Sequence, residues 1–250
     1  MDAVVKPIQP RVLLAVPTLD RNLSVEFLTS MAETMNLCQT YGILVDLAFL
    51  GGDQFIAKAR NHLATGFLQN PLKQDCLFFI DADQGWEATA FVRAVIDRHD
   101  IVAGAVPKKT DDLTFNNVEL VTNEQGDCTI EDGMLEVRRI GTGYFRIKRE
   151  ALERFVADYS NKYEPGDGGP LPWHYDIFNA QVHYTEDEGL GKFWGEDLDF
   201  CNKWKAIGGR LWLDPNITFK HVGRKCWEAN YMKWLQANHK VITTKDKAAA

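Results

Sequence analysis

Two aspartates follow directly on an apolar run in the sequence CLFFIDADQGW, which begins at Cys76. Asp81 and Asp83 are separated by one residue, and strand geometry relaxes where the chain leaves a sheet, so both carboxylates can face one crevice. Carboxylate oxygens are the ligands that hard divalent cations prefer. The alternative is an incidental turn, in which aspartate is common. The spacing favours a Mn²⁺ or Mg²⁺ site at Asp81 and Asp83.

A second acidic group, in the sequence GEDLDF, contains Glu196, Asp197 and Asp199 at the start of a helix predicted over 197–207. A carboxylate in this position can accept a proton from a hydroxyl group. Aspartate at a helix N-terminus also caps free N–H groups and interacts favourably with the helix dipole. The residues alone leave both interpretations open.

Two further groups carry weaker signals. His221 follows a predicted strand in ITFKHVG, and a lone histidine is a candidate metal ligand only if it faces Asp83. Lys58, Arg60 and Asn61 occur together in IAKARNHLA. They form either the solvated face of an amphipathic helix or a group from which Arg60 reaches a diphosphate or a base edge.

The elements that position these residues alternate between apolar runs and helical periodicity. Strands are predicted at 12–16, 44–50, 76–80 and 101–106, and helices at 25–37, 54–68 and 88–97. This order indicates a parallel sheet with right-handed crossovers and helices on both faces. Ligands of open α/β sheets bind at the carboxyl edge of the strands, where Asp81 and Asp83 stand.

The alternation fades beyond Pro107. Strands at 118–121, 134–140 and 144–147 are predicted to form a mixed extension, and the glycines and prolines of 164–172 predict a loop. The aromatic residues Trp173, Tyr184 and Trp194 follow this loop. They either close over a ligand as a lid or pack the extension.

The motifs occur in an order that resembles the GT-A glycosyltransferases, nearest to the family 2 type of bacterial and phage enzymes. The matching stretches are VPT, AKARN, FFIDADQGW, GTGYFRIKREAL, GEDLDFCNKWKAIGGRLWLDP and FKHVG. The resemblance implies an α/β GT-A fold, which is Rossmann-like, with a mostly parallel central sheet and a mixed C-terminal extension. It also implies one domain over 1–250, with a nucleotide-sugar half at about 12–106, an acceptor and catalytic half at about 107–223, and a C-terminal helix and tail at 224–250.

The resemblance assigns roles to individual residues. The metal ligands are Asp81, Asp83 and His221, and the acidic pair Glu196 and Asp197 supplies the base. The residues that bind the donor are Pro17, Thr18, Arg60, Asn61, Asp81, Ala82 and Asp83. Our hypothesis is that Asp197 is the catalytic base and that Glu196 or Asp199 orients the acceptor. The implied donor is a UDP- or GDP-linked sugar. The acceptor is a hydroxyl group, for which a glycan is one candidate, and a separate base favours inversion. Segment 164–192 matches little of the family, so the acceptor is not identified.

Two other functions fit part of the pattern. In a phosphohydrolase, Asp81 would be the nucleophile and Asp83 the acid/base, but Gly85 stands where such enzymes usually have Thr or Val. In a sugar- or nucleotide-binding module, the same fold would have lost turnover. The acidic groups argue against that loss.

The composition restricts the partners and the compartment. The chain of 250 residues has a net charge of −7, which disfavours nucleic acids and anionic lipid surfaces as partners. Its five cysteines include no CxxC pair and indicate reduced thiols. We find no apolar run of about 18 residues and no signal peptide, and therefore expect a cytoplasmic protein without a transmembrane segment.

Overall fold

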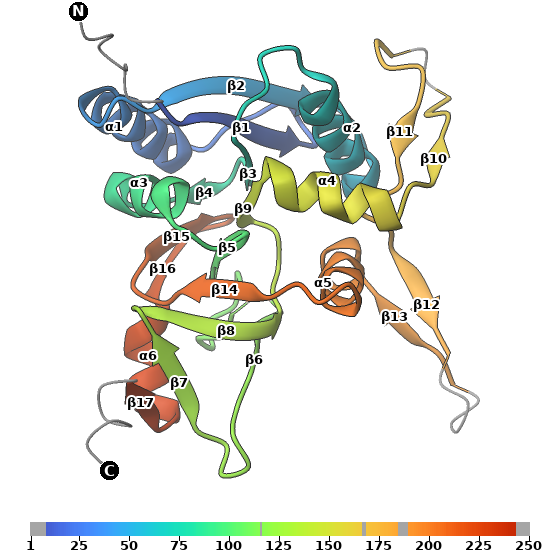
Figure 1. Cartoon of the computed structure of the whole chain (residues 1–250). Coiled ribbons are helices and arrows are strands. Elements are labelled where there is room, and N and C mark those ends of the chain that lie inside the picture. Colours follow the sequence, from blue (N-terminus) through green and yellow to red (C-terminus); the bar gives the residue numbers. More distant parts are fainter. Residues whose placement is uncertain (1–8, 116, 167–168, 185–189, 244–250) are drawn as a thin grey trace, which may run out of the picture.

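The computed structural model describes residues 9–115, 117–166, 169–184 and 190–243. Predictions for the tail beyond 243, and for parts of the loops at 167–168 and 185–189, lie outside the described residues. The helices are α1 (Val25–Thr40), α2 (Ile56–Gln69), α3 (Ala88–Ile96), α4 (Arg149–Asp158), α5 (Glu196–Ala206) and α6 (Tyr231–Asn238). Figure 1 shows them around a central sheet.

Within the described residues, the strands form one large sheet and three small ones. The central sheet contains β1 (Arg11–Thr18), β2 (Leu44–Gly51), β3 (Cys76–Ile80), β5 (Ile101–Gly104), β6 (Glu119–Leu120), β7 (Cys128–Glu131), β8 (Met134–Arg139), β9 (Tyr144–Lys148), β14 (Leu211–Asp214) and β17 (Val241–Thr243). The small sheets pair β4 (Gln84–Gly85) and β16 (Cys226–Asn230) with β15 (Thr218–Val222), β10 (Lys162–Tyr163) with β11 (His174–Tyr175), and β12 (Gln181–His183) with β13 (Lys192–Trp194).

The central sheet has a parallel body and a mixed extension. Strand β1 pairs in parallel with β2 and β3, and β14 pairs in parallel with β5. Strand β9 lies between β3 and β5 and is antiparallel to both, so β3 and β5 run in the same direction. Strand β8 adds an antiparallel edge to β14. The predicted mostly parallel sheet with a mixed extension is confirmed.

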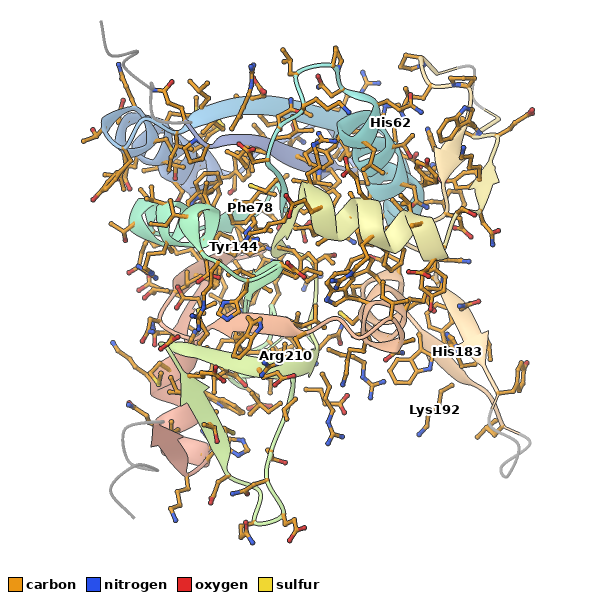
Figure 2. All side chains as sticks on the ribbon, viewed as in Figure 1. His62, Phe78, Tyr144, His183, Lys192 and Arg210 are labelled. Carbon is orange, nitrogen blue, oxygen red and sulfur yellow. The ribbon has the colours of Figure 1, made fainter. Side chains whose placement is uncertain are left out.

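Helices cover both faces of the sheet because its central strands are apolar on both sides. All five residues of β3 are buried. Phe78 stacks on Phe91 of α3 with 4.6 Å between ring centroids, whereas its neighbour Phe79 contacts Phe178 on the opposite face. Figure 2 shows Phe78 and Tyr144 together at the centre of the molecule, where their ring centroids are 4.7 Å apart.

Helix α4 is an element that the sequence pattern does not predict. It begins with Arg149, whose buried guanidinium donates hydrogen bonds to the carbonyl oxygens of Gln74 and Phe67. An analysis of hydrophobic periodicity counts a charged residue such as Arg149 as facing solvent, and therefore does not predict that this helix packs on the sheet.

Among the described residues, no helix has both the length and the apolar character needed to cross a membrane.

Candidate functional site

The carboxyl ends of the parallel strands form a polar edge with a cavity of about 300 Å³. Arg60 from α2, Asp81 after β3, and Glu196 and Asp197 from α5 all line this cavity. The backbone from Gly141 to Gly143 closes another side. The structure therefore brings together acidic and basic residues that are far apart in the sequence, in a space at the lower end of the range for small-molecule sites.

Arg60 links the two acidic groups. Its side chain is only 5% exposed and donates hydrogen bonds to Glu196 Oε1 and, at 3.1 Å, to Asp81 Oδ1. The interpretation of Arg60 as part of a solvated helix face is wrong. Its guanidinium instead holds the carboxylate of Asp81, which follows β3, and that of Glu196 on α5 at fixed positions beside the cavity.

Both carboxylates that contact Arg60 are harder to ionise than free ones. Burial raises the pKa of Asp81, the charge of Arg60 offsets part of that effect, and the neighbouring Asp83 raises the pKa further. Burial likewise raises the pKa of Glu196, with Arg60 opposing it and Asp197 adding to it. This is the expected result of placing several carboxylates beside one buried cation.

Helix α5 separates its three acidic residues. Asp197 lines the cavity, where its Oδ2 accepts a hydrogen bond from Asn117 Nδ2 at 3.2 Å and its Oδ1 accepts one from the N–H of Leu198 at 2.8 Å. Residues two apart on a helix project about 200° apart. Asp199 is accordingly directed to the opposite side of α5, into the protein.

Asp199 takes part in a buried polar network rather than in the cavity. It accepts hydrogen bonds from Gln181 at 2.7 Å and contacts His183 Nε2 at 2.9 Å, and Lys203 pairs with it at 2.7 Å. Gln181 and His183 belong to β12, which forms a hairpin with β13. Figure 2 shows His183 and Lys192 on this hairpin, away from the central sheet. Asp199 therefore anchors the hairpin to α5, and the geometry gives no support to its predicted role in orienting an acceptor.

The register of β4 and β15 brings His221 to Asp83. Gln84 pairs with His221 in an antiparallel ladder, and the N–H of Val222 donates to the carbonyl oxygen of Asp83 at 2.8 Å. The imidazole Nε2 lies 3.5 Å from Asp83 Oδ1. The condition placed on His221 as a candidate metal ligand, that it faces Asp83, is thus met.

The tautomer of His221 is fixed by the backbone. Its Nδ1 lies 2.7 Å from the carbonyl oxygen of Pro107, which can only accept a hydrogen bond, so Nδ1 carries the hydrogen. When the ring is neutral, the lone pair is therefore on Nε2, the nitrogen that faces Asp83. Histidines that bind metals usually donate their other N–H in this way.

The surroundings of Asp83 suit a cation. Its Oδ1 is buried and accepts no hydrogen bond from the described residues, and Lys109 Nζ bonds to its Oδ2. Burial raises the pKa of Asp83, but the positive charges of protonated His221 and of Lys109 stabilise its carboxylate and outweigh this effect, so that the pKa is lowered overall. Asp83 Oδ1 and Nε2 of a neutral His221 are donor atoms of the kinds that bind divalent cations.

The protein ligands are too few for a complete metal site of their own. Within the described part of the chain, no three His, Cys, Asp or Glu side chains converge as a metal-binding group. Mg²⁺ is usually bound through one or two carboxylates together with substrate phosphates and waters. Asp83 and His221 fit that kind of shared site, whereas Asp81 is bonded to Arg60.

The other predicted donor residues have varied surroundings. Thr18 lines a groove of about 430 Å³ with Phe49 and Gly51 at the ends of β1 and β2, and Pro17 is buried beside it. The carbonyl oxygen of Ala82 accepts a hydrogen bond from the N–H of Ser24 at 3.0 Å. These positions lie along the predicted donor edge.

Asn61 has a structural role that its pattern did not indicate. Its side chain is buried, with Oδ1 accepting from the N–H groups of Ile177 and Phe178 and Nδ2 donating to the carbonyl oxygen of Phe178. These bonds attach segment 177–178 to α2 and direct the amide away from solvent. The surface interpretation of Asn61 is wrong.

The aromatic residues of the predicted lid do not line the cavity. Trp173 packs against Tyr175 and under Lys162, and Trp194 lies 4.0 Å beneath the guanidinium of Arg139. Tyr184 is 75% exposed on the hairpin. In this conformation they pack the extension, and closure of a lid stays a prediction.

Several residues of the site carried little sequence signal. Lys109 and Asn117 lie in an irregular segment with no periodicity to place them. Gly143 lies in the motif GTGYFRIKREAL, but no role was assigned to it; a Cβ there would lie 2.4 Å from Gln84 Nε2 and 3.1 Å from Asp81 Oδ2. The N–H of Asp81 donates to the carbonyl oxygen of Gly143 at 3.0 Å, so glycine permits the close approach that positions Asp81.

No protein-family model matches the sequence, and no curated protein matches it. Among solved structures, the chain is similar to A197 from STIV, with 18% identity and a TM-score of 0.50 over 85% of this chain and 86% of that one. It is also similar to the catalytic domain of Drosophila β1,4-galactosyltransferase 7 in complex with xylobiose (16% identity, TM-score 0.47, 86% and 71% covered). A third similar structure is a glycosyltransferase involved in glycosylation of the major capsid of PBCV-1 (10% identity, TM-score 0.35, 65% and 72% covered). At this identity the similarity to A197 shows a shared fold alone, and the predicted mixed α/β fold is confirmed.

Proposed function

We propose that this protein is a metal-dependent glycosyltransferase that moves a sugar from a UDP- or GDP-linked donor to an acceptor hydroxyl group. The observation that carries the proposal is the convergence, at one edge of the sheet, of the Asp83–His221 pair and a cavity lined by Asp197. The motifs that resemble the family 2 type of GT-A enzymes support the same activity. Fold alone would leave the activity open.

The donor would lie along the carboxyl edge of the sheet. The groove at Thr18, which Leu23 and Phe49 also line, would take the nucleoside, and Asp83 with His221 would hold Mn²⁺ or Mg²⁺ beside the diphosphate. The cation would neutralise the charge that develops on the leaving diphosphate. Asp81, held by Arg60, is assigned to the ribose or to the metal.

Asp197 is the proposed general base. Its hydrogen bonds with Asn117 and the Leu198 N–H hold the carboxylate at the cavity wall. It would accept the proton of the acceptor hydroxyl as that oxygen bonds to the anomeric carbon and the bond from this carbon to the diphosphate breaks. A base separate from the leaving group favours inversion. Glu196 is bonded to Arg60 and supports the position of α5.

A turnover screen tests this function. UDP- and GDP-sugars are incubated with the protein and Mn²⁺, with glycan acceptors and with water alone, and released nucleoside diphosphate is measured. We expect release from at least one donor, dependence on Mn²⁺, and loss in Asp197→Asn. The configuration of the product at the anomeric carbon then tests inversion.

Two outcomes would replace the proposal. Donor binding without release across the acceptor panel would indicate a sugar-nucleotide-binding protein. Release of phosphate from simple phosphate esters, in the absence of a sugar nucleotide, would indicate phosphohydrolase chemistry at Asp81.

A further inference from the structure

Lys109 forms an ion pair with Asp83, the carboxylate that would bind the proposed cation. Its ammonium group bonds to Asp83 Oδ2, while Oδ1 of the same carboxylate faces His221 Nε2. The lysine side chain is 35% exposed, so solvent and ligands reach it. A cation that coordinates Asp83 would meet a positive charge already bonded there.

The position of Lys109 is fixed by its segment. Pro107 bridges to Phe115, and the N–H of Lys108 donates to the carbonyl oxygen of Thr114 at 2.8 Å, which closes the segment into a loop. The same Pro107 supplies the carbonyl oxygen that orients His221. One loop thus sets both the imidazole and the competing ammonium.

The aliphatic part of the Lys109 side chain packs closely against Gly223. A Cβ on Gly223 would lie 3.0 Å from Cδ of Lys109, so the stem crosses this glycine closely. Asp111 of the loop pairs with Lys225, on the segment that joins β15 to β16. These contacts hold the loop against the end of β15 while the ammonium end of the lysine can still rotate on its flexible stem.

We infer that Lys109 neutralises Asp83 in the metal-free protein and, when a divalent cation displaces it, binds the donor diphosphate. This inference rests on the proposed function. A divalent cation and an ammonium group repel each other at contact distance, whereas the diphosphate of a donor bridged to that cation attracts the ammonium group. Lysine is a common point-charge ligand for phosphate. Lys109 therefore opposes binding of the metal alone and favours binding of metal and nucleotide together.

The inference predicts opposite effects on two ligands. In Lys109→Met, Mn²⁺ alone binds about threefold to fivefold tighter, because a partly exposed ion pair no longer competes. UDP or GDP in the presence of Mn²⁺ binds about tenfold weaker, because a charge-assisted bond is lost. Titration calorimetry measures both affinities. A merely structural role would weaken both ligands or neither.

Lys108→Met is the matched control. Lys108 is the exposed neighbour in the same loop, and its replacement removes the same charge without removing the contact with Asp83. We expect both affinities to stay within about twofold of the wild type. Equal tightening of Mn²⁺ binding in both variants, or unchanged binding in Lys109→Met, would overturn the inference. If the wild-type protein binds no Mn²⁺ even with nucleotide present, the metal dependence in the proposed function fails as well. If the wild type binds Mn²⁺ and nucleotide but Lys109→Met changes neither affinity, only the inference about Lys109 fails.

Discussion

Asp197 and Asp199 are of the same residue type, stand two positions apart, and have opposite surroundings. The first lines the cavity at the sheet edge, and the second is fully buried among Gln181, His183 and Lys203. Helical phase alone produces this difference. It follows that one residue can be tested for chemistry and the other for stability.

Replacing Asp197 with Asn should lower kcat by about 10²- to 10⁴-fold, because the amide cannot accept the acceptor proton. The donor KM and the thermal unfolding temperature should change little, since Asn still accepts the hydrogen bond from Leu198 N–H. Steady-state kinetics and thermal unfolding measure these effects.

Asp199→Asn is the informative contrast. It leaves Lys203 without its buried carboxylate and should lower the free energy of unfolding by about 2 kcal/mol. Its remaining folded fraction should turn over at a rate close to the wild type. Turnover of Asp197→Asn at the wild-type rate would remove Asp197 from the mechanism.

At the scale of elements, the site depends on contacts between pieces of chain that have no local signal for one another. Asn61 attaches α2 to segment 177–178 through both ends of its amide. The pairing of β4 with β15 places His221 beside Asp83. These contacts help to set the positions of the side chains to which we assign roles in the proposed function.

Asn61→Ala should lower the free energy of unfolding by about 3 kcal/mol, because it leaves two buried N–H groups and a buried carbonyl without their partner. Chemical denaturation measures the change. Asn36→Ala, on the exposed side of α1, is the control and should change stability by about 0.5 kcal/mol or less. Equal effects of the two substitutions would contradict the role of Asn61.

Element prediction succeeded where local sequence determines the structure. The run CLFFI predicted β3 with its observed bounds, because a strand buried on both faces is apolar throughout. Because the end of β3 at Ile80 was predicted, the position of Asp81 and Asp83 directly after this strand was predicted too. Other features depend on contacts between distant parts of the chain, about which short sequence patterns carry no information. They are the insertion of β9 between β3 and β5, the burial of Asp199 against β12, and the contact of Lys109 with Asp83.

At the scale of the whole molecule, the central sheet is tied by polar contacts at the edge opposite the site. Arg11 on β1 donates two hydrogen bonds to Asp46 on β2, at 2.7 and 2.8 Å, and Gln74 before β3 donates a third at 2.9 Å. The Arg11 bond holds the pKa of Asp46 below its ordinary value; burial opposes the shift and Gln74 adds to it.

This lowered pKa predicts how stability depends on pH. Since the unfolded carboxyl binds protons more readily, the contribution of Asp46 is present above the ordinary aspartate pKa of about 4 and is lost as the pH falls through the folded-state pKa. Asp46→Asn should therefore cost about 1 kcal/mol at pH 7 and less at about pH 3.5. Urea denaturation at both values measures this, and an equal cost at both would contradict it.

The central claim is that Asp83 and His221 hold a cation that the donor diphosphate shares. Titration calorimetry of UDP and GDP, with and without Mn²⁺, tests it in the wild type, in Asp83→Asn and in Asp112→Asn, a control at an exposed position of the loop that carries Lys109. We predict that Mn²⁺ strengthens binding of one nucleotide at least tenfold, about 1.4 kcal/mol, in the wild type and in Asp112→Asn but not in Asp83→Asn. An undiminished effect of Mn²⁺ in Asp83→Asn would contradict the account.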